Sequence, residues 1–408
     1  MLQRNILIWL LASLFYAYQY ILRVIPNIIA PELMTKFNIS IIDIGQFGGL
    51  YYIGYTLAHI PVGILLDRFG PKIVLPLCII LMFTGTLPLI CFDEWYYSIL
   101  GRVIVGIGSS ASAIGIFKVA TMYFAQEKSP KMASLSIIIG ISGAVYGGLP
   151  LDYLLNKFGW NNVLYTFSAF GCLLALLLFF VTPKSDTQQE NVCMKDLKKV
   201  LLNKNIILVS FFGGLMVGPL EGFADGWVKA FLCEVYNMTQ DLASSLSSLI
   251  FIGMGAGSFS LACLLEKYRS RHYEIIIACS LTMIASFLLL FIGVGGVYIA
   301  SSALFIIGFA SGYQVVTIYK AISYVSNNLV GLATAMSNMI VMIFGYFFHT
   351  VIAEIINLYW NHTIIQGNPV YGQELLITAM SIIPACLLLA VFGFLWLKKQ
   401  QNKQLLAG

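Results

Sequence analysis

The chain has 408 residues, of which 59% are hydrophobic and only 10% are charged. Soluble proteins usually carry about 25% charged residues, so a deficit of this size along the whole chain excludes a soluble domain with a single membrane anchor. The net charge of +5 does not indicate a nucleic-acid partner, because the positive charges lie in short loops.

Long apolar runs predict an all-α polytopic membrane protein. A spanning helix needs about 20 apolar residues, and these runs are too long and too continuous for barrel strands. The first run is also too long for a signal-peptide core and is predicted to be retained as a helix. Twelve spans are predicted, at 6–30, 45–66, 73–92, 96–123, 131–154, 161–182, 206–235, 243–265, 273–292, 297–325, 330–357 and 373–397.

The loops between these spans alternate in their content of basic residues. Placing the N-terminus inside puts sixteen Lys and Arg residues on the cytoplasmic side and leaves only Lys36 and Lys157 outside. By the positive-inside rule, both termini are expected to be cytoplasmic.

The chain is predicted to consist of two pseudo-symmetric six-helix halves. The longest polar stretch, 183–205, separates an N-terminal half, 1–182, from a C-terminal half, 206–397, and 398–408 is expected to be a cytoplasmic tail. Four stretches recur. Three have an offset of 199 residues and the last has an offset of 202: 37–40 with 236–239, 52–54 with 251–253, 65–69 with 264–268, and 117–118 with 319–320. Several matches at equivalent helix ends favour a duplication over chance.

A charged turn at 63–72 reads G-I-L-L-D-R-F-G-P-K and separates the second span from the third. The Gly-Pro step at Gly70 breaks the helix, and charged residues there are costly in hydrocarbon. The form G-x-x-x-D-R-x-G-x-K resembles the loop 2–3 signature of the major facilitator superfamily, a large family of secondary transporters. A degraded copy, with an acid at Glu266, stands 199 residues later.

The resemblance covers nearly the whole chain, and it implies further roles. Span 4 carries the family's second motif, R-x-x-x-G-x-G, at 102–108. The resemblance implies that Arg102 takes part in proton coupling, and the alternative is an anchor at the outer surface beside Asp93 and Glu94. The patterns at 18–23 and 221–226 resemble a bacterial branch that includes nutrient importers of intracellular bacteria, which implies the inner membrane. In relatives the loop after span 2 latches the outward-open state. That gating role is expected for Gly63, Asp67, Arg68, Gly70, Lys72 and, in the second copy, Glu266.

Charged residues inside the spans are few, and each is costly unless it faces a partner or a water-filled cavity. Arg23 in span 1 shares a polar helix face with Gln19 and Tyr20. A guanidinium there can hold a carboxylate or phosphate by two hydrogen bonds, or it can form a structural salt bridge to another helix. We expect all three residues to bind substrate.

Glu221 and Asp225 in span 7 are four residues apart and lie on one helix face. The glycines and the proline between 218 and 226 predict a kinked or broken helix that lines a cavity. Two close carboxylates that are partly desolvated share a proton readily, as a proton-coupling site requires. The alternative is that one of them neutralises Arg23 or Lys229, and the sequence does not indicate which one carries the proton.

Other candidates are less specific. Lys118 and Lys320 occupy related positions in spans 4 and 10, where they are expected either to line the inner vestibule or to reach lipid headgroups. Lys320 is included among the substrate-binding residues, and Tyr55 and Trp227 are expected to shape the pocket. Most aromatic residues of such a chain belong to its core or its interfacial belts. A lone membrane histidine, His349, is interpreted as a packing residue.

These residues predict a secondary active transporter that works by alternating access, with the two halves rocking about a midplane site. An Arg in one half and an acidic pair in the other suit a zwitterion. We therefore predict proton-coupled import of an amino acid or short peptide, with a nucleoside as a further option. The alternative is a proton-driven efflux antiporter for drugs or metabolites, although 140–150 lacks the Gly-Pro step of the family's antiporters.

The expected partners are a small-molecule substrate, protons and the lipid bilayer, with a proton gradient in place of a cofactor. The chain has no H-E-x-x-H metal motif, and its eight cysteines show no paired spacing. No enzyme activity, metal site or nucleic-acid binding is expected, and the protein is predicted to be a monomer.

Overall fold

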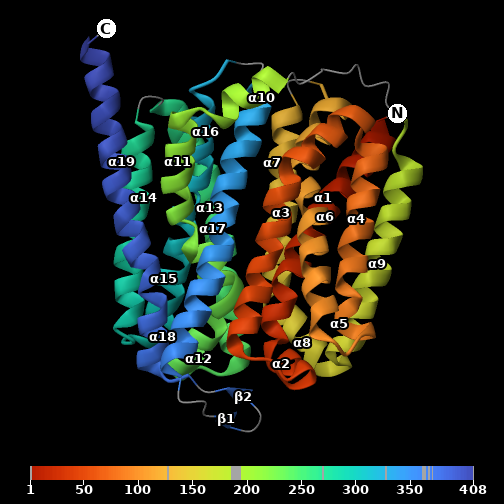
Figure 1. Cartoon of the computed structure of the whole chain (residues 1–408), viewed down its shortest axis with the longest axis vertical. Coiled ribbons are helices and arrows are strands. Elements are labelled where there is room, and N and C mark those ends of the chain that lie inside the picture. Colours follow the sequence, from red (N-terminus) through yellow and green to blue (C-terminus); the bar gives the residue numbers. More distant parts are fainter. Residues whose placement is uncertain are drawn as a thin grey trace. The chain divides into compact units, whose positions relative to one another are not determined.

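The computed structural model describes residues 2–407 except 126–127, 185–193, 269–270, 327–328, 361–363, 366–367 and 370. The chain separates into two compact units, Met1–Val192 and Cys193–Gly408, here called the N-unit and the C-unit. Both consist of long helices, coloured red to yellow in the N-unit and green to blue in the C-unit (Figure 1).

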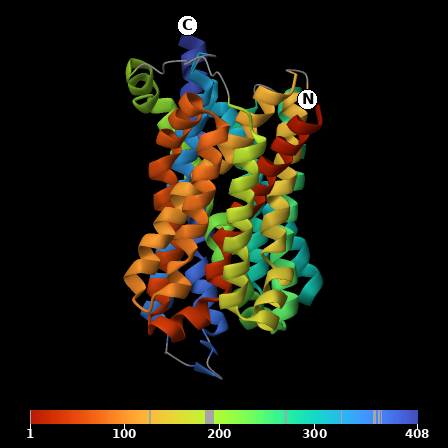
Figure 2. The same ribbon diagram turned by 90° about the vertical axis from the view of Figure 1, so that its right-hand side faces the viewer.

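The N-unit is built of six long helices and three short ones in its described residues. They are α1 (Leu2–Ile28), α2 (Ala30–Phe37), α3 (Ile41–Phe69), α4 (Pro71–Thr86), α5 (Pro88–Cys91), α6 (Trp95–Tyr123), α7 (Ser129–Tyr146), α8 (Leu149–Phe158) and α9 (Trp160–Val181). The long helices of this unit run side by side along one direction (Figure 2). α7 and α8 form one run that is bent by 45°.

The C-unit repeats this plan with more interruptions. Its described elements are α10 (Met194–Leu201), α11 (Lys204–Leu215), the π-helix η1 (Gly218–Trp227), α12 (Val228–Tyr236), α13 (Gln240–Lys267), α14 (His272–Phe291), α15 (Gly296–Ser311), α16 (Tyr313–Ile322), α17 (Val330–Tyr359), β1 (Ile364–Ile365), β2 (Asn368–Pro369), α18 (Gln373–Met380) and α19 (Ile382–Ala407). The chain from α11 through η1 to α12 forms a single candidate span, Lys204–Tyr236.

The prediction of a polytopic all-α protein is confirmed. Among the described residues, 11 helical runs are long and apolar enough to cross a membrane, or 12 if the bent pair α7–α8 is one span. Each overlaps a predicted span, and the boundaries differ by a few residues: the first run is Gln3–Pro26 rather than 6–30. The sequence did not predict the two-residue strands β1 and β2, which pair antiparallel before α18.

The internal repeat is visible in the backbone. In the described residues, the non-glycine residues with positive φ are Asn38 and Asn237, both with φ of 51°, and they are 199 positions apart. Each ends a helix, α2 or α12. Ser40 and Thr239 then cap the next helix by accepting a hydrogen bond from a backbone N–H three residues on. The matched stretches 37–40 and 236–239 therefore form the same local structure, in which one helix ends and the next begins.

Glycine contacts repeat at the same offsets. A Cβ added to Gly54 on α3 would collide with the carbonyl oxygen of Val103 on α6, and one added to Gly253 on α13 would collide with that of Phe305 on α15. Gly308 on α15 meets the backbone of α13 in the same way. Small residues of this kind let helices approach until backbones touch, which is how helices pack when lipid supplies no hydrophobic drive.

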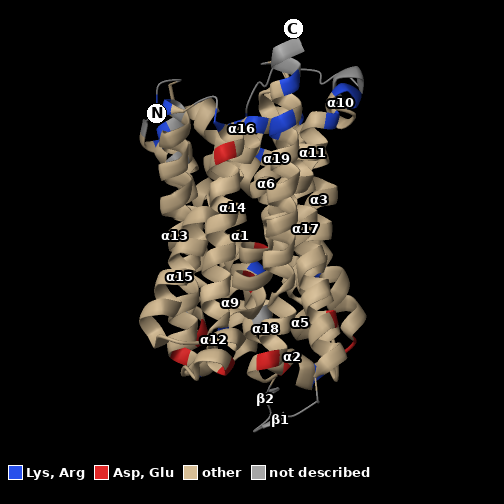
Figure 3. Ribbon diagram, turned by 90° about the vertical axis from the view of Figure 1, so that its left-hand side faces the viewer, with Lys and Arg blue, Asp and Glu red and all other residues tan. Residues whose placement is uncertain are grey.

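Charged side chains are unevenly distributed along the helices of each unit. Lys and Arg gather toward one end and Asp and Glu toward the other, with few charges between (Figure 3). This is the pattern expected when helix ends lie in water and helix middles lie in hydrocarbon.

The segments predicted as central loop and tail are partly helical. Within the central stretch 183–205, α10 forms a short helix, while 185–193 lie outside the described residues. The predicted tail continues α19 as far as Ala407. Its Lys398 Nζ lies 2.9 Å from Glu274 Oε1 at the start of α14, so the tail packs onto its own unit.

Gly54→Ala and Gly253→Ala should each lower the midpoint of thermal unfolding by roughly 5 °C or more, because an added methyl group forces apart two helices in backbone contact. Differential scanning fluorimetry on detergent-solubilised protein measures this. Gly331→Ala is the matched control, since a Cβ there has open space. Equal midpoints for all three variants would contradict the backbone contact.

Candidate functional site

In the N-unit, one face of α1 gathers polar side chains that were predicted to bind substrate. Gln19, Tyr20 and Arg23 are buried, each less than a tenth exposed. The Arg23 guanidinium lies 4.6 Å from the centroid of the Tyr20 ring. The hydroxyl oxygens of Tyr16 and Tyr20 are 3.5 Å apart. Ser112 Oγ on α6 donates to Gln19 Oε1 over 3.2 Å. The three predicted residues thus lie together, and α6 contributes to the same face.

Arg102 on α6 is buried, with 3% of its surface exposed. Its guanidinium donates to three backbone carbonyls: Nη1 to Leu22 at 3.0 Å, Nη2 to Arg23 at 2.8 Å and Nε to Phe47 at 3.3 Å. Two of these carbonyls belong to α1 and one belongs to α3. The residue that the family resemblance assigns to proton coupling therefore binds the backbone of two neighbouring helices.

Tyr55 on α3 is buried, and its ring stacks on that of His59 with centroids 5.0 Å apart and an interplanar angle of 26°. His59 also lies against the backbone of Ser110 on α6. The sequence analysis missed His59. The signal was the four-residue spacing of Tyr51, Tyr55 and His59, which places three rings on one helix face.

In the C-unit, Glu221 and Asp225 lie on the ten-residue π-helix η1, and both are buried. The break that the glycines and Pro219 predicted in span 7 is therefore present. π-helical segments are rare and are frequent at functional sites. η1 keeps the two carboxylates within one turn of each other in the interior of the unit.

The glycines of η1 let α17 pack directly against it. A Cβ added to Gly222 would lie 2.9 Å from Cβ of Phe348, and one added to Gly226 would lie 3.2 Å from Cε1 of His349. His349 thus lies beside the residue that follows Asp225. This buried position against η1 is compatible with the sequence interpretation of His349 as a packing residue.

Trp227 ends η1 and belongs to an aromatic cluster. Its ring centroid is 6.0 Å from that of Tyr371, which in turn is 5.4 Å from that of Trp360. In the described part of the chain, Trp227 Nε1 is a buried donor with no hydrogen-bond partner, and so is Gln314 Nε2 on α16. A buried donor without a partner is costly, so these two groups are suited to meet an acceptor on a ligand or a water molecule.

Lys320 on α16 is buried. Its Nζ donates to Gln401 Oε1 on α19 at 3.0 Å and lies 4.9 Å and 4.6 Å from the ring centroids of Tyr273 and Tyr324. The two tyrosine hydroxyls are 2.8 Å apart. Lys320 thus lies among Gln401, Tyr273 and Tyr324, none of which was predicted to bind substrate.

The turn at 63–72 owes its shape to Gly70. This residue has φ of 74°, where a side chain is strained, and it ends α3 and starts α4, whose first residue is Pro71. A Cβ added to Gly63 would lie 3.7 Å from Cδ1 of Ile114 on α6, which is an ordinary van der Waals distance. Arg68 and Lys72 lie over the rings of Phe69 and Phe179.

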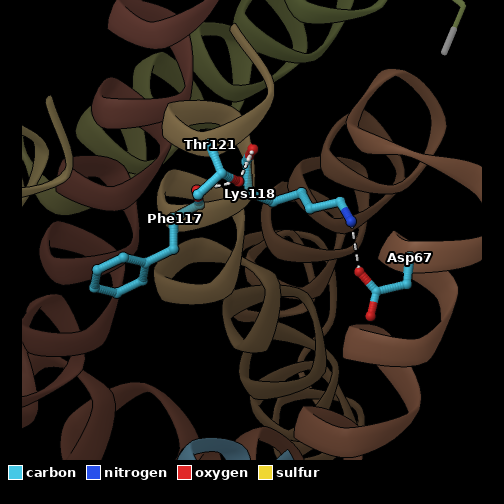
Figure 4. A network of polar contacts seen from close by, with 4 residues as sticks. All are labelled: Asp67, Phe117, Lys118 and Thr121. Carbon is cyan, nitrogen blue, oxygen red and sulfur yellow. Dashed lines mark hydrogen bonds and ion pairs between the residues drawn. The ribbon is translucent and has the colours of Figure 1, made fainter. Parts of the chain in front are cut away.

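Asp67 forms an ion pair that the sequence did not predict. Lys118 Nζ on α6 lies 2.8 Å from Asp67 Oδ1 (Figure 4). Lys118 therefore pairs with an acid of its own unit. The sequence had predicted that Lys118 either lines the inner vestibule or reaches lipid headgroups. The pair is partly exposed, with 27% of the Lys118 side chain and 52% of the Asp67 side chain accessible.

The second copy of the turn is less completely described. α13 ends at Lys267, whose Nζ lies 5.5 Å from the centroid of the Tyr268 ring. The side chain of Glu266 and residues 269–270 lie outside the described residues. The gating role expected for Glu266 therefore remains a prediction.

The repeated bundles of long apolar helices, with buried charges on α1 and η1, define an integral membrane protein of the two-repeat transporter class. A profile of the Major Facilitator Superfamily matches residues 8–349, so the chain belongs to this superfamily, and the family prediction is confirmed.

Relatives agree with this class. An "Uncharacterized transporter" of Buchnera aphidicola subsp. Schizaphis graminum (strain Sg) is 30% identical over 166 residues, 40% of each chain. The chain spans about two fifths of the length of the first curated relatives that it matches.

Solved structures share the fold. A bacterial homolog of the human lysosomal transporter Spinster matches with a TM-score of 0.73 and 17% identity, over 96% of both chains. The nucleoside transporter NupG matches with a TM-score of 0.75 and 15% identity, over 95% of this chain and 99% of that one.

Lys118→Met should change the free energy of unfolding by only about 0.2–1 kcal/mol, because a half-exposed ion pair is screened by solvent. Asp67→Asn should cost a similar amount and should slow transport several-fold while ligand affinity stays within about twofold. Chemical denaturation and initial uptake rates measure the two effects. Lys128→Met, an exposed lysine outside the pair, is the control. Loss of ligand binding in a folded Asp67→Asn protein would refute a gating role.

Proposed function

We propose that this protein is a proton-coupled importer of a small polar nutrient that works by alternating access in a bacterial inner membrane. One observation carries the proposal. Glu221 and Asp225 are buried together on a π-helical break in the C-unit, and Arg23 is buried on the first span of the N-unit. Buried intramembrane charges are costly and are kept where they serve substrates or ions.

The charges suit a zwitterion. A guanidinium binds a carboxylate through two hydrogen bonds, and a carboxylate pair accepts from an ammonium group. Arg23 therefore suits the carboxylate of an amino acid or a short peptide, and the acidic pair suits its ammonium group. The buried donors Trp227 Nε1 and Gln314 Nε2 have no partner in the described residues and suit a substrate carbonyl oxygen such as that of a peptide bond.

The acidic pair also suits proton coupling. Both carboxylates are buried within one turn of η1, so a proton bound there would influence the binding of a substrate at the same place. His349 lies next to Gly226 and supplies a further titratable group beside Asp225. A proton gradient is the energy source in this proposal, and no bound cofactor enters it.

The proposed orientation places both termini in the cytoplasm, with the protein acting as a monomer. The gathering of Lys and Arg toward one end of the helices in each unit supports it through the positive-inside rule (Figure 3). The turn at 63–72 and the tail residue Lys398 then lie on the cytoplasmic side.

A nucleoside is the second candidate substrate. The stacked rings of Tyr55 and His59 offer flat aromatic surfaces to a base. The structurally similar NupG is named a nucleoside transporter, which supports including nucleosides among the tested substrates.

Purified protein in liposomes should accumulate a labelled amino acid or dipeptide when the outside is made acidic, and it should stop when the gradient is collapsed. Asp225→Asn and Glu221→Gln should reduce gradient-driven uptake at least tenfold, since each removes a proton carrier from the pair. Asp241→Asn, an exposed acid of the same unit, is the control. Uptake that ignores the gradient would rule out proton coupling, and accumulation of nucleosides alone would favour the second candidate.

Arg23→Ala should weaken ligand binding about 10–100-fold, because a charge-assisted hydrogen-bonded pair contributes roughly 1.5–3 kcal/mol. Ligands found by a thermal-shift screen of the wild-type protein are then titrated against the variant by calorimetry. Arg4→Ala, at the exposed end of α1, is the matched control. Unchanged affinity in Arg23→Ala would remove this residue from the site.

A further inference from the structure

The helix that carries Arg23 contains a proline that removes a backbone hydrogen bond within the membrane. Pro26 lies inside α1 and has no N–H group. In an α-helix the N–H of residue 26 would bond to the carbonyl of Leu22, so that oxygen loses its intrahelical donor, and the proline ring pushes it aside. Leu22 is only 1% exposed, so water has little access to this oxygen and another protein group must supply a donor.

Arg102 supplies this donor. Its Nη1 bonds the Leu22 oxygen at 3.0 Å, and its Nη2 bonds the next carbonyl, that of Arg23, at 2.8 Å. The two prongs of one guanidinium thus cover two successive carbonyls at the proline break. Its Nε bonds Phe47 at 3.3 Å, which links the break to α3. A planar fork of fixed donors fits this arrangement, and a lysine ammonium does not.

Glycines pack α6, the helix that carries Arg102, against α3 and α4. A Cβ at Gly106 would collide with the carbonyl oxygen of Tyr51 on α3, and a Cβ at Gly108 would collide with that of Cys78 on α4. α6 therefore lies in backbone contact with both helices. The guanidinium also stacks within 5.0 Å of the centroid of the Tyr51 ring, which covers its apolar face. The residues of the pattern R-x-x-x-G-x-G thus have two roles. The two glycines pack α6 against α3 and α4, and the arginine bonds backbone carbonyls of α1.

We propose that Arg102 is a positioning residue, which replaces the backbone hydrogen bond that Pro26 removes from α1 and so fixes the place of Arg23. Because Nη2 holds the carbonyl of Arg23 itself, loss of Arg102 frees the backbone from which the Arg23 side chain extends. The consequence for substrate rests on the proposed function, whereas the coupling between Arg102 and Pro26 does not.

A double-mutant cycle tests the coupling without any ligand. Arg102→Met should lower the midpoint of thermal unfolding by roughly 5 °C. Pro26→Ala restores an N–H to residue 26, so the Leu22 oxygen regains a partner in its own helix. In the Pro26→Ala background, Arg102→Met should lower the midpoint of thermal unfolding by less than half as much as it does in the wild-type background. Pro61→Ala, which removes another intrahelical proline on α3, is the matched control and should leave the effect of Arg102→Met unchanged.

Two further readouts separate positioning from general stability. Hydrogen exchange in the peptide covering 20–30 should be at least tenfold faster in Arg102→Met, with the peptide covering 71–86 unchanged. In transport assays, the variant should raise KM about tenfold and leave the pH of half-maximal uptake where it was. Arg102→Lys, which keeps the charge but not the fork, should behave as Arg102→Met does, and it replaces that variant if Arg102→Met does not fold.

The proposal would be overturned if Arg102→Met lowered the unfolding midpoint by the same amount with Pro26 present and in the Pro26→Ala background. A shifted pH profile in Arg102→Lys with normal exchange at 20–30 would also overturn it, since that result assigns Arg102 to proton transfer. Absence of transport in every variant and in the wild type would refute the proposed function alone, because the cycle and the exchange measurements need no substrate.

Discussion

A backbone carbonyl in hydrocarbon has no water to bond, and both helices that carry the charges of the site are interrupted. α1 is interrupted by Pro26, and the seventh span changes from α11 to the π-helix η1. In each unit a side chain of a neighbouring helix donates to carbonyls beside the interruption. Arg102 bonds two carbonyls of α1. The hydroxyl of Tyr313 on α16 donates to the Gly213 carbonyl on α11 at 2.7 Å, an oxygen that also accepts from the backbone N–H of Met216. These side-chain hydrogen bonds link spans 1 and 4 in one unit and spans 7 and 10 in the other.

This link places function and stability on the same residues. Close approach of helices needs residues without side chains. The glycines of α6 at 106 and 108 let it pack against α3 and α4, and those of η1 at 222 and 226 let it pack against α17. Interrupted helices, glycine contacts and buried charges therefore occur in the same parts of each unit.

The architecture was predictable because it depends on signals that lie in short windows of sequence. The length of the apolar runs predicts the spans, and the basic loops predict the orientation. The duplication is recognisable from matching helix caps, Asn38 and Ser40 in one half and Asn237 and Thr239 in the other. The break in span 7 was also predictable, since glycines and a proline cluster around Glu221. These features depend on local chemistry, which one sequence contains in full.

The partners of the charged side chains were not predictable in the same way. Asp67 and Lys118 lie 51 residues apart in the sequence, and only the packing of α3 on α6 brings them to 2.8 Å. The same packing brings His59 to Ser110, and the packing of α16 with α14 and α19 encloses Lys320. A guanidinium that bonds carbonyls leaves no mark in the sequence at all, because every residue has a carbonyl. Arg102 could therefore be recognised as important from its motif while its partners could not.

The backbone contacts at Gly54 and Gly253 have a mechanical consequence. Where two main chains touch without intervening side chains, no change of rotamer can accommodate a displacement of one helix against the other. We therefore expect α3 and α6 to move together, and likewise α13 and α15. Displacements within a unit are then expected away from these contacts, at places where the helices are already irregular. The 45° bend between α7 and α8 and the π-helical stretch η1 are two such places.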